Sequence, residues 1–280
     1  MAATTTALRE QLSTAQPVRL LGVGRTFATP SGPRPVLRDV DLDIAPGEIL
    51  AIIGASGCGK STLLRQIIGL DHPDTGSILV ADEPCHDIDP RVAIAFQEPR
   101  LLPWRTIAHN VALGLPQGTP DEVGKRRVTE LLELVGLEAS ANLRPRQVSG
   151  GMAQRASLAR ALARNPGVLL LDEPFGALDA LTRLKMQDLL LEIHAAEPTT
   201  IILVTHDVEE ALYLADRVVL LDNLALGAEE SIQSVTDVPG ERPRDRASVE
   251  LTELRAGLLE GLGVSTHHSP APDPDLHHSI

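Results

Sequence analysis

Residues 54–62 of the chain read GASGCGKST, and this stretch decides the fold. It fits the pattern G-x-x-x-x-G-K-[ST], with the apolar run ILAII before it and the helix-like run KSTLLRQIIGL from Lys60 onward. A loop between a buried strand and a helix can point successive backbone N–H groups into one concavity, where the helix dipole also favours an anion. The stretch therefore predicts a phosphate-binding loop for a nucleoside triphosphate.

The residue types in this loop suit that role. Lys60 places a point charge on the β- and γ-phosphates, and Ser61 offers a hydroxyl to Mg²⁺. Cys58 is interpreted as a small residue that fits the loop, in preference to a reactive thiol, although the helix start and the neighbouring lysine both favour a thiolate. The residues expected to contact the nucleotide here are Gly54, Ala55, Ser56, Gly57, Cys58, Gly59, Lys60, Ser61 and Thr62.

Short apolar runs and helix-like runs alternate on both sides of the loop. The runs EILAIIG, PGVLLLDEP, TTIILVTHD and DRVVLLD are rich in Ile, Val and Leu and end in turn residues. Such strands are typical of a sheet that is covered on both faces. The middle of the chain has no comparable run and is expected to be helical. We therefore predict an α/β core with a helical subdomain at about residues 103–160.

The run VLLLDEP, residues 168–174, supplies the next part of the predicted site. Ligands of open α/β sheets bind at the carboxyl ends of the strands, so Asp172 is expected to face the phosphates and to hold Mg²⁺. Glu173 is then placed to polarise the attacking water as a general base.

A second anion site is predicted where Ser149, Gly150 and Gly151 begin a helix, in VSGGMAQRASLARALARNP. A Ser-Gly-Gly helix start offers free N–H groups, a hydroxyl and a dipole. Because the first loop already holds its own phosphates, this second site is expected to meet the γ-phosphate bound by another subunit.

Composition narrows the class of protein. The chain has 280 residues, of which 43% are hydrophobic and 22% charged, as in an ordinary globular protein. The net charge of −13 argues against broad binding to nucleic acid or anionic lipid. Two cysteines are too few for a disulfide framework. We find no pattern of a signal peptide or membrane span, and we expect a cytosolic chain.

Together these motifs resemble the ATP-binding subunits of ABC transporters, over roughly residues 18–230. The resemblance implies an ATP hydrolase with a P-loop NTPase core, N-terminal antiparallel strands and the helical subdomain, using ATP and Mg²⁺. It also implies a head-to-tail dimer with two ATP molecules between the subunits. A soluble ABC ATPase that drives assembly or repair, with no transport partner, is the alternative.

The resemblance assigns roles to further residues. Gln97 matches the glutamine that reaches Mg²⁺ and the attacking water, and His206 matches the switch histidine that contacts the γ-phosphate. Ser149, Gly150 and Gly151 match the signature motif, and Asp179 matches the D-loop. Phe27 lies where the family places an aromatic that stacks on adenine, before the insert PSGPRP.

The stretch FQEPRLLPW, residues 96–104, narrows the subfamily and holds the only tryptophan. With THDVEEALYLADRVVLL further on, it resembles the nitrate/sulfonate/taurine importers, nearest to those for aliphatic sulfonates. This implies a peripheral protein on the cytoplasmic face of the inner membrane, two permease subunits contacted near Gln97–Trp104, and an extracytoplasmic substrate-binding protein reached indirectly. Trp104 is interpreted as the permease anchor, with a core residue of the helical subdomain as the alternative.

The domain prediction has four parts. Residues 1–16 and 265–280 are expected to be disordered tails, and residues 17–230 form the ATPase domain. Residues 231–264 are expected to be a short extension with one amphipathic helix. Its apolar positions are Leu251, Leu254 and Leu258.

Overall fold

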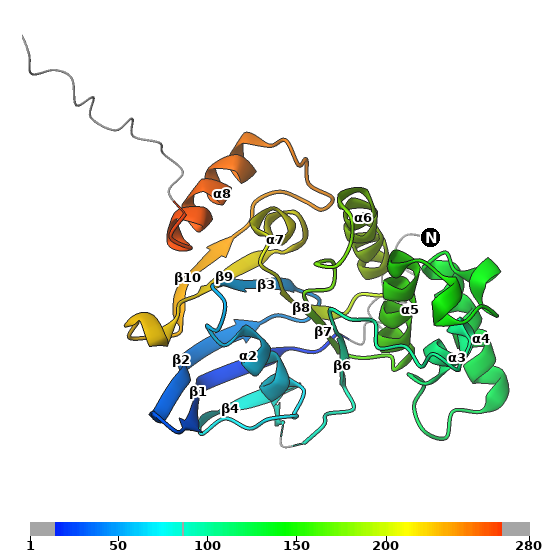
Figure 1. Cartoon of the computed structure of the whole chain (residues 1–280), viewed down its shortest axis with the longest axis horizontal. Helices are drawn as coiled ribbons and strands as arrows, with labels where there is room; N and C mark the ends of the chain where they lie inside the picture. Colours follow the sequence, from blue (N-terminus) through cyan, green and yellow to red (C-terminus); the bar gives the residue numbers. More distant parts are fainter. Residues whose placement is uncertain (1–14, 86, 265–280) are drawn as a thin grey trace, which may run out of the picture.

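The structure is a computed structural model, and it describes residues 15–85 and 87–264. The predictions for residues 1–14 and 265–280 therefore lie outside the described residues. Two sheets pack side by side, and helices cover the larger one (Figure 1). The strands are β1 (Val18–Thr29), β2 (Gly32–Ile44), β3 (Ile49–Gly54), β4 (Thr75–Val80), β5 (Glu83–Pro84), β6 (Val92–Ala95), β7 (Val168–Asp172), β8 (Thr200–Val204), β9 (Arg217–Leu221) and β10 (Ile232–Asp237).

The larger sheet has the order β10-β9-β3-β8-β7-β6, and all of its neighbouring strands are parallel except β10, which is antiparallel to β9. The smaller sheet has the order β2-β1-β4-β5 and is antiparallel throughout. These sheets confirm the predicted α/β class, with a mostly parallel core and antiparallel N-terminal strands.

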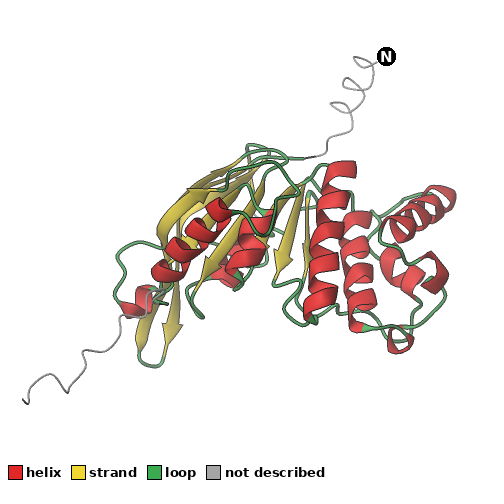
Figure 2. Cartoon of the chain, turned by 90° about the horizontal axis from the view of Figure 1, so that it is seen from above, coloured by secondary structure: helices red, strands yellow, loops and turns green. Residues whose placement is uncertain are grey.

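Most helices lie on one face of the larger sheet, and three of them form a group at one end of the molecule (Figures 1 and 2). That group is α3, α4 and α5, which pack on one another. The helices are α2 (Lys60–Ile67), α3 (Ile107–Ala112), α4 (Asp121–Leu134), α5 (Gly150–Ala163), α6 (Ala180–Ala196), α7 (Val208–Leu214) and α8 (Val249–Gly261), with 3₁₀ turns at Glu138–Ser140, Pro145–Gln147 and Leu224–Leu226.

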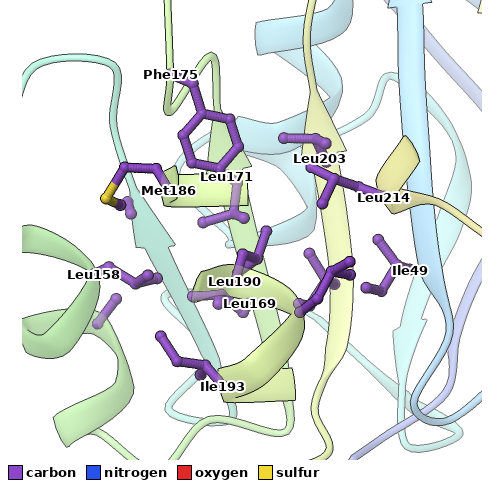
Figure 3. Packing of buried hydrophobic residues seen from close by; sticks show 14 of the residues in the cluster. Ile49, Leu158, Leu169, Leu171, Phe175, Met186, Leu190, Ile193, Leu203 and Leu214 are labelled. Carbon is purple, nitrogen blue, oxygen red and sulfur yellow. The ribbon is translucent and has the colours of Figure 1, made fainter. Parts of the chain in front are cut away.

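The parallel strands separate two apolar cores. Along β3, Ile49, Ala51 and Ile53 belong to the core beneath the helices, whereas Leu50 and Ile52 belong to the core shared with α2 and the smaller sheet. This alternation follows from the two-residue period of a strand, and both faces are apolar because both are covered. Figure 3 shows the helix-side core, where side chains of β7 and β8 meet those of α6.

The C-terminal part contains more than the predicted helix. Leu251 and Leu258 of α8 are buried, as the amphipathic pattern suggested. However, β10 extends the main sheet, and the sequence analysis did not predict this strand. Its alternating burial and single partner strand are typical of an edge strand, which carries a weak apolar signal. The boundary at residue 230 stays a prediction.

Candidate functional site

A cavity of about 550 Å³ opens over the loop between β3 and α2. Three buried parallel strands, β3, β7 and β8, end beside one another here, which brings their following turns to one edge of the sheet. The cavity is lined by Arg34, Val36, Gly54, Ser56, Gly57, Gly59, Lys60, Ser61, Thr62, Glu173 and His206. Residues that are far apart in the sequence thus share one hollow.

The loop backbone has the shape that a phosphate cradle needs. Gly59, just before α2, has φ +107°, and a Cβ there would lie 2.6 Å from Cδ2 of Leu37. Lys60 is buried, and its ammonium donates hydrogen bonds to the carbonyl oxygens of Gly54 at 2.7 Å and Ala55 at 3.0 Å. The chain therefore encloses a positive charge at the start of a helix, which is an anion-binding arrangement.

The acid at the end of β7 lies across from the helix start. Ser61 Oγ donates to Asp172 Oδ1 at 3.4 Å, so the two predicted metal ligands face each other. Burial, and then the neighbouring charge of Glu173, raise the pKa of the Asp172 carboxyl. A nearby cation would favour the ionised form of this carboxyl and so lower its pKa.

These oxygen ligands fit Mg²⁺, which usually keeps several waters and takes one or two protein oxygens together with substrate phosphates. Within residues 15–85 and 87–264, no group of three or more His, Cys, Asp or Glu could hold a metal ion.

Glu173 and His206 face each other across the cavity, with 3.3 Å between Glu173 Oε2 and His206 Nδ1. Glu173 has φ +46°, which for a residue with a Cβ costs roughly 1–2 kcal/mol. Its backbone N–H donates to the Val204 carbonyl at 2.9 Å, and this bond to β8 fixes the unusual turn. Strain of this kind is typical of functional sites.

Gln97 does not line the cavity, but its side chain approaches Gly176, as Glu173 does. A Cβ added to Gly176 would be 3.2 Å from the Gln97 Nε2 atom and 3.7 Å from Glu173 Oε2. The absence of a side chain at Gly176 therefore lets the amide and the carboxylate approach the same point. The structure brings together the predicted loop, Asp172, Glu173, His206 and Gln97.

The predicted signature residues lie elsewhere. Ser149 caps α5, accepting a hydrogen bond from the Met152 N–H at 3.2 Å. Ser149 and Gly151 line a separate groove of about 640 Å³, whose other walls come from α6 and the end of α4. Asp179 caps α6 and accepts from the Thr182 N–H, and Thr182 lines this same groove. In one chain, the two predicted anion sites are thus distinct.

Two sequence interpretations meet the structure less directly. Phe27 is 37% exposed and does not line the cavity, but it pairs across the β1–β2 ladder with Arg34, which does. The Arg25 guanidinium lies over the Phe27 ring, 4.7 Å from the ring centre. The Cys58 side chain is 1% exposed and packs in the core beneath the loop, which favours the interpretation of a small fitting residue over a reactive thiol.

The sequence analysis missed two residues of the cavity wall. Arg34 and Val36 of β2 line it, and Arg34 Nη2 lies 3.7 Å from a Cβ built on Gly57. They belong to β2, which packs against the loop at Gly59, so no local pattern in the loop sequence indicated a role.

The segment around Trp104 is held firmly, although its tryptophan is 66% exposed. Gln154 of α5 donates to the Phe96 carbonyl at 3.1 Å, and Arg160 of α5 donates to the carbonyls of Pro99 and Arg100 at 2.7 and 2.9 Å. Asn110 binds both the N–H and the carbonyl of Leu102. A large apolar side chain is therefore presented on a rigid support.

Comparison with known proteins defines the class. Residues 37–176 match a family model described as ABC transporter. The chain is 47% identical over 264 residues to the aliphatic sulfonates import ATP-binding protein SsuB 1 of Streptomyces avermitilis, covering 94% of this chain and 93% of the relative. It is 44% identical over 247 residues to the nitrate import ATP-binding protein NrtD of Synechococcus elongatus, covering 86% and 89%. The chain belongs to the ABC transporter family of ATP-binding proteins.

Solved structures agree with this assignment. The ATP-binding cassette MJ0796, in a dimeric post-hydrolysis state bound to ADP and Pi, matches with a TM-score of 0.68 and 32% identity over 80% of this chain and all of that one. The protein cbiO1 of Clostridium perfringens matches with a TM-score of 0.70 and 26% identity, over 79% of this chain and 88% of that one. The predicted family and fold are confirmed, and an assembly or repair ATPase is not favoured.

None of the helices in the described part of the chain is long and apolar enough to cross a membrane.

Proposed function

We propose that this chain is the ATP-hydrolysing subunit of an ABC importer for aliphatic sulfonates or related small anions. The observation that carries the proposal is the single cavity that joins the glycine loop, Lys60, Glu173 and His206. The importers named among its relatives, at 44–47% identity over most of the chain, support the class of transport.

The chemistry follows from the side chains in the cavity. Lys60 and the loop N–H groups bind the β- and γ-phosphates, and Mg²⁺ held by Ser61, Asp172 and Gln97 would neutralise charge on them. Glu173 accepts a proton from the attacking water, typically worth about 10²–10⁴-fold in rate. His206 lies 3.3 Å from Glu173 and would contact the γ-phosphate and orient that carboxylate.

The second anion site gives the reaction its link to movement. Ser149, Gly150 and Gly151 would bind the γ-phosphate held by a second copy of the chain, so that two ATP molecules close a head-to-tail dimer. The dimeric state of the similar cassette MJ0796 supports this arrangement. Asp179, at the start of α6, would lie at the same junction, and Phe27 would stack on adenine at the outer rim.

The permease contact is proposed at Gln97–Trp104. Arg160 and Gln154 tie this segment to α5, the helix that begins at Ser149. Movement of α5 on dimer closure would therefore reach the segment and two permease subunits. The protein would lie at the cytoplasmic face of the inner membrane, and a substrate-binding protein outside would communicate with it only through the permease.

Reconstitution with a membrane permease of the sulfonate-importer type tests the proposal. We expect ATP hydrolysis by the wild type but not by Lys60→Ala, co-purification with the permease, and ATP-dependent uptake of an aliphatic sulfonate. Taurine and nitrate, offered in parallel, identify the substrate class. Hydrolysis with no permease association would support the assembly or repair ATPase instead.

A further inference from the structure

Glu210 is a buried acid for which the proposed reaction has no assigned use. It lies in α7, four residues after His206, and only 3% of its surface is exposed. Gln187 of α6 donates from Nε2 to Glu210 Oε2 at 3.2 Å, and the Thr205 hydroxyl also hydrogen-bonds to this carboxylate. A carboxylate shielded from water therefore depends on two neutral donors for its stability.

The residues on both sides of His206 belong to this arrangement. The Asp207 N–H donates to Thr205 Oγ1 at 3.0 Å, so His206 lies within a turn that is closed by the Thr205 side chain. The Asp207 carboxylate accepts from the N–H groups of Glu209 and Glu210 and caps α7. Because Thr205 contacts Glu210 and Asp207 together, its hydroxyl joins the buried acid to the turn that carries His206.

Arg246, which is distant in the sequence, holds Gln187, the residue that donates to Glu210. Arg246, between β10 and α8, donates to Gln187 Oε1 at 2.7 Å and to Asp188 Oδ1 at 3.0 Å. Its guanidinium also lies over the Tyr213 ring, 3.4 Å from the ring centre. Since the Gln187 carbonyl is engaged by Arg246, the amide NH₂ is directed to Glu210.

We propose that Glu210 is a positioning residue for His206, which acts by holding Thr205, and that Arg246 of the C-terminal segment sets the strength of this hold through Gln187. The inference rests on the proposed ATPase function, because it gives His206 a part in hydrolysis. It assigns the C-terminal segment a regulatory contact with the catalytic turn.

Protonation offers a way to observe this role. The ionised carboxylate accepts both hydrogen bonds, whereas the neutral acid carries an O–H that competes with one donor, so the Thr205 hydroxyl loses its partner or turns. Burial raises the pKa of Glu210 to about 7, against the effect of the two hydrogen bonds. Among the surrounding charges, Asp207 raises this pKa and Arg183 of α6 lowers it.

The test measures steady-state ATP hydrolysis by the full chain across the neutral pH range. In the wild type, kcat/KM should rise with pH with a midpoint of about 7, since this constant reports groups of the free enzyme. Glu210→Gln should lose that step and show a kcat roughly tenfold lower on the alkaline side, as expected for misplacing a catalytic group. Its ATP affinity and melting temperature confirm that the variant is folded.

Two further variants isolate the contacts. Thr205→Val keeps the size of the side chain and removes the hydroxyl, and it should lower kcat to a similar extent with Glu210 intact. Arg246→Gln should move the midpoint to higher pH, because Gln187 is then free to turn its amide away. Glu209→Gln and Arg255→Gln are the controls: these exposed partners lie 3.0 Å apart beside the network, and neither change should alter the profile.

The outcomes separate this inference from the proposed function. A Glu210→Gln enzyme with the wild-type rate and the wild-type step would overturn the inference alone, provided that His206→Ala is inactive. An unmoved midpoint in Arg246→Gln would overturn the role of the C-terminal segment. A wild-type rate in His206→Ala would overturn the assigned role of His206, and the inference with it.

Discussion

The cavity over the phosphate-binding loop and the groove beside Ser149 both lie at the start of a helix, but they differ in how much of a site each contains. Around the loop, the chain supplies a buried lysine, a tight backbone and two acids. Ser149 and Gly150 are exposed, and a Cβ added to Gly150 would meet no atom within 4 Å. The cavity over the loop is lined by residues of its own chain. We infer that the groove beside Ser149 is completed only when a second copy of the chain binds.

The largest expected effect comes from removing the catalytic base of the cavity over the loop without changing the shape of the cavity. Glu173→Gln should lower ATP hydrolysis by about 10²–10⁴-fold, because the amide cannot accept a proton from water. Nucleotide binding should persist, since Lys60 and the loop are unchanged. The variant should then accumulate as an ATP-bound dimer, measured by light scattering.

Near wild-type hydrolysis by Glu173→Gln would remove this residue from the reaction. The matched control is Glu253→Gln, a change at an exposed acid of α8 that does not line the cavity, which should leave hydrolysis unchanged.

The next effect concerns the exposed surface at Trp104, where we propose that the permease binds. Trp104→Ala should weaken binding to the permease by about 2 kcal/mol, roughly thirtyfold, as expected for an interface hot spot. The isolated subunit should keep its melting temperature and basal hydrolysis, because the side chain is 66% exposed. Equilibrium titration of the subunit with the detergent-solubilised permease measures this affinity.

Tryptophan fluorescence provides an internal check, because Trp104 is the only tryptophan. Its emission should move to the blue when the permease binds. A core role would instead predict a blue, quencher-shielded emission before any partner is added, and a loss of about 3–5 kcal/mol of stability in Trp104→Ala.

The smallest expected effect tests whether Arg34, at the rim of the cavity over the loop, belongs to the ATP site. Arg34 is exposed at the cavity rim, so solvent screens its charge, and Arg34→Gln should weaken ATP binding by about 1 kcal/mol, roughly fivefold. Arg34→Lys should restore part of this. The control Arg19→Gln removes a partly exposed arginine that pairs with Asp82 and does not line the cavity. Equal affinities in the two variants would exclude Arg34 from the site.

The sequence predicted the parts of the site that depend on local chemistry. The loop glycines, Lys60, Asp172 and Glu173 each sit at a strand end or helix start, where the residue type and the adjoining apolar run carry the signal. The family resemblance added His206, which lines the cavity, and Gln97, which lies near Glu173 beside Gly176. These residues come together because parallel strands end side by side.

Other features depend on contacts between distant segments, and no local pattern encodes them. Arg34 reaches the cavity because β2 packs against the loop, and Arg246 reaches Gln187 across 59 positions of the chain. Glu210 is acidic in the helical run VEEALYL, where it looks like a solvated residue beside Glu209. Only packing of α6 on α7 shows that one of these acids is buried and the other is not.

The most direct test of the central claim combines damage to the cavity over the loop with damage to the groove beside Ser149. Ser149→Arg places a bulky cation where the partner's γ-phosphate would bind, and Lys60→Ala removes the loop ammonium. Each homodimer should be inactive. In a heterodimer purified with two tags, the intact loop of one chain faces the intact Ser149 of the other, so the account predicts that ATP hydrolysis partly returns. Inactivity of verified heterodimers that still bind ATP would contradict a site shared between two chains.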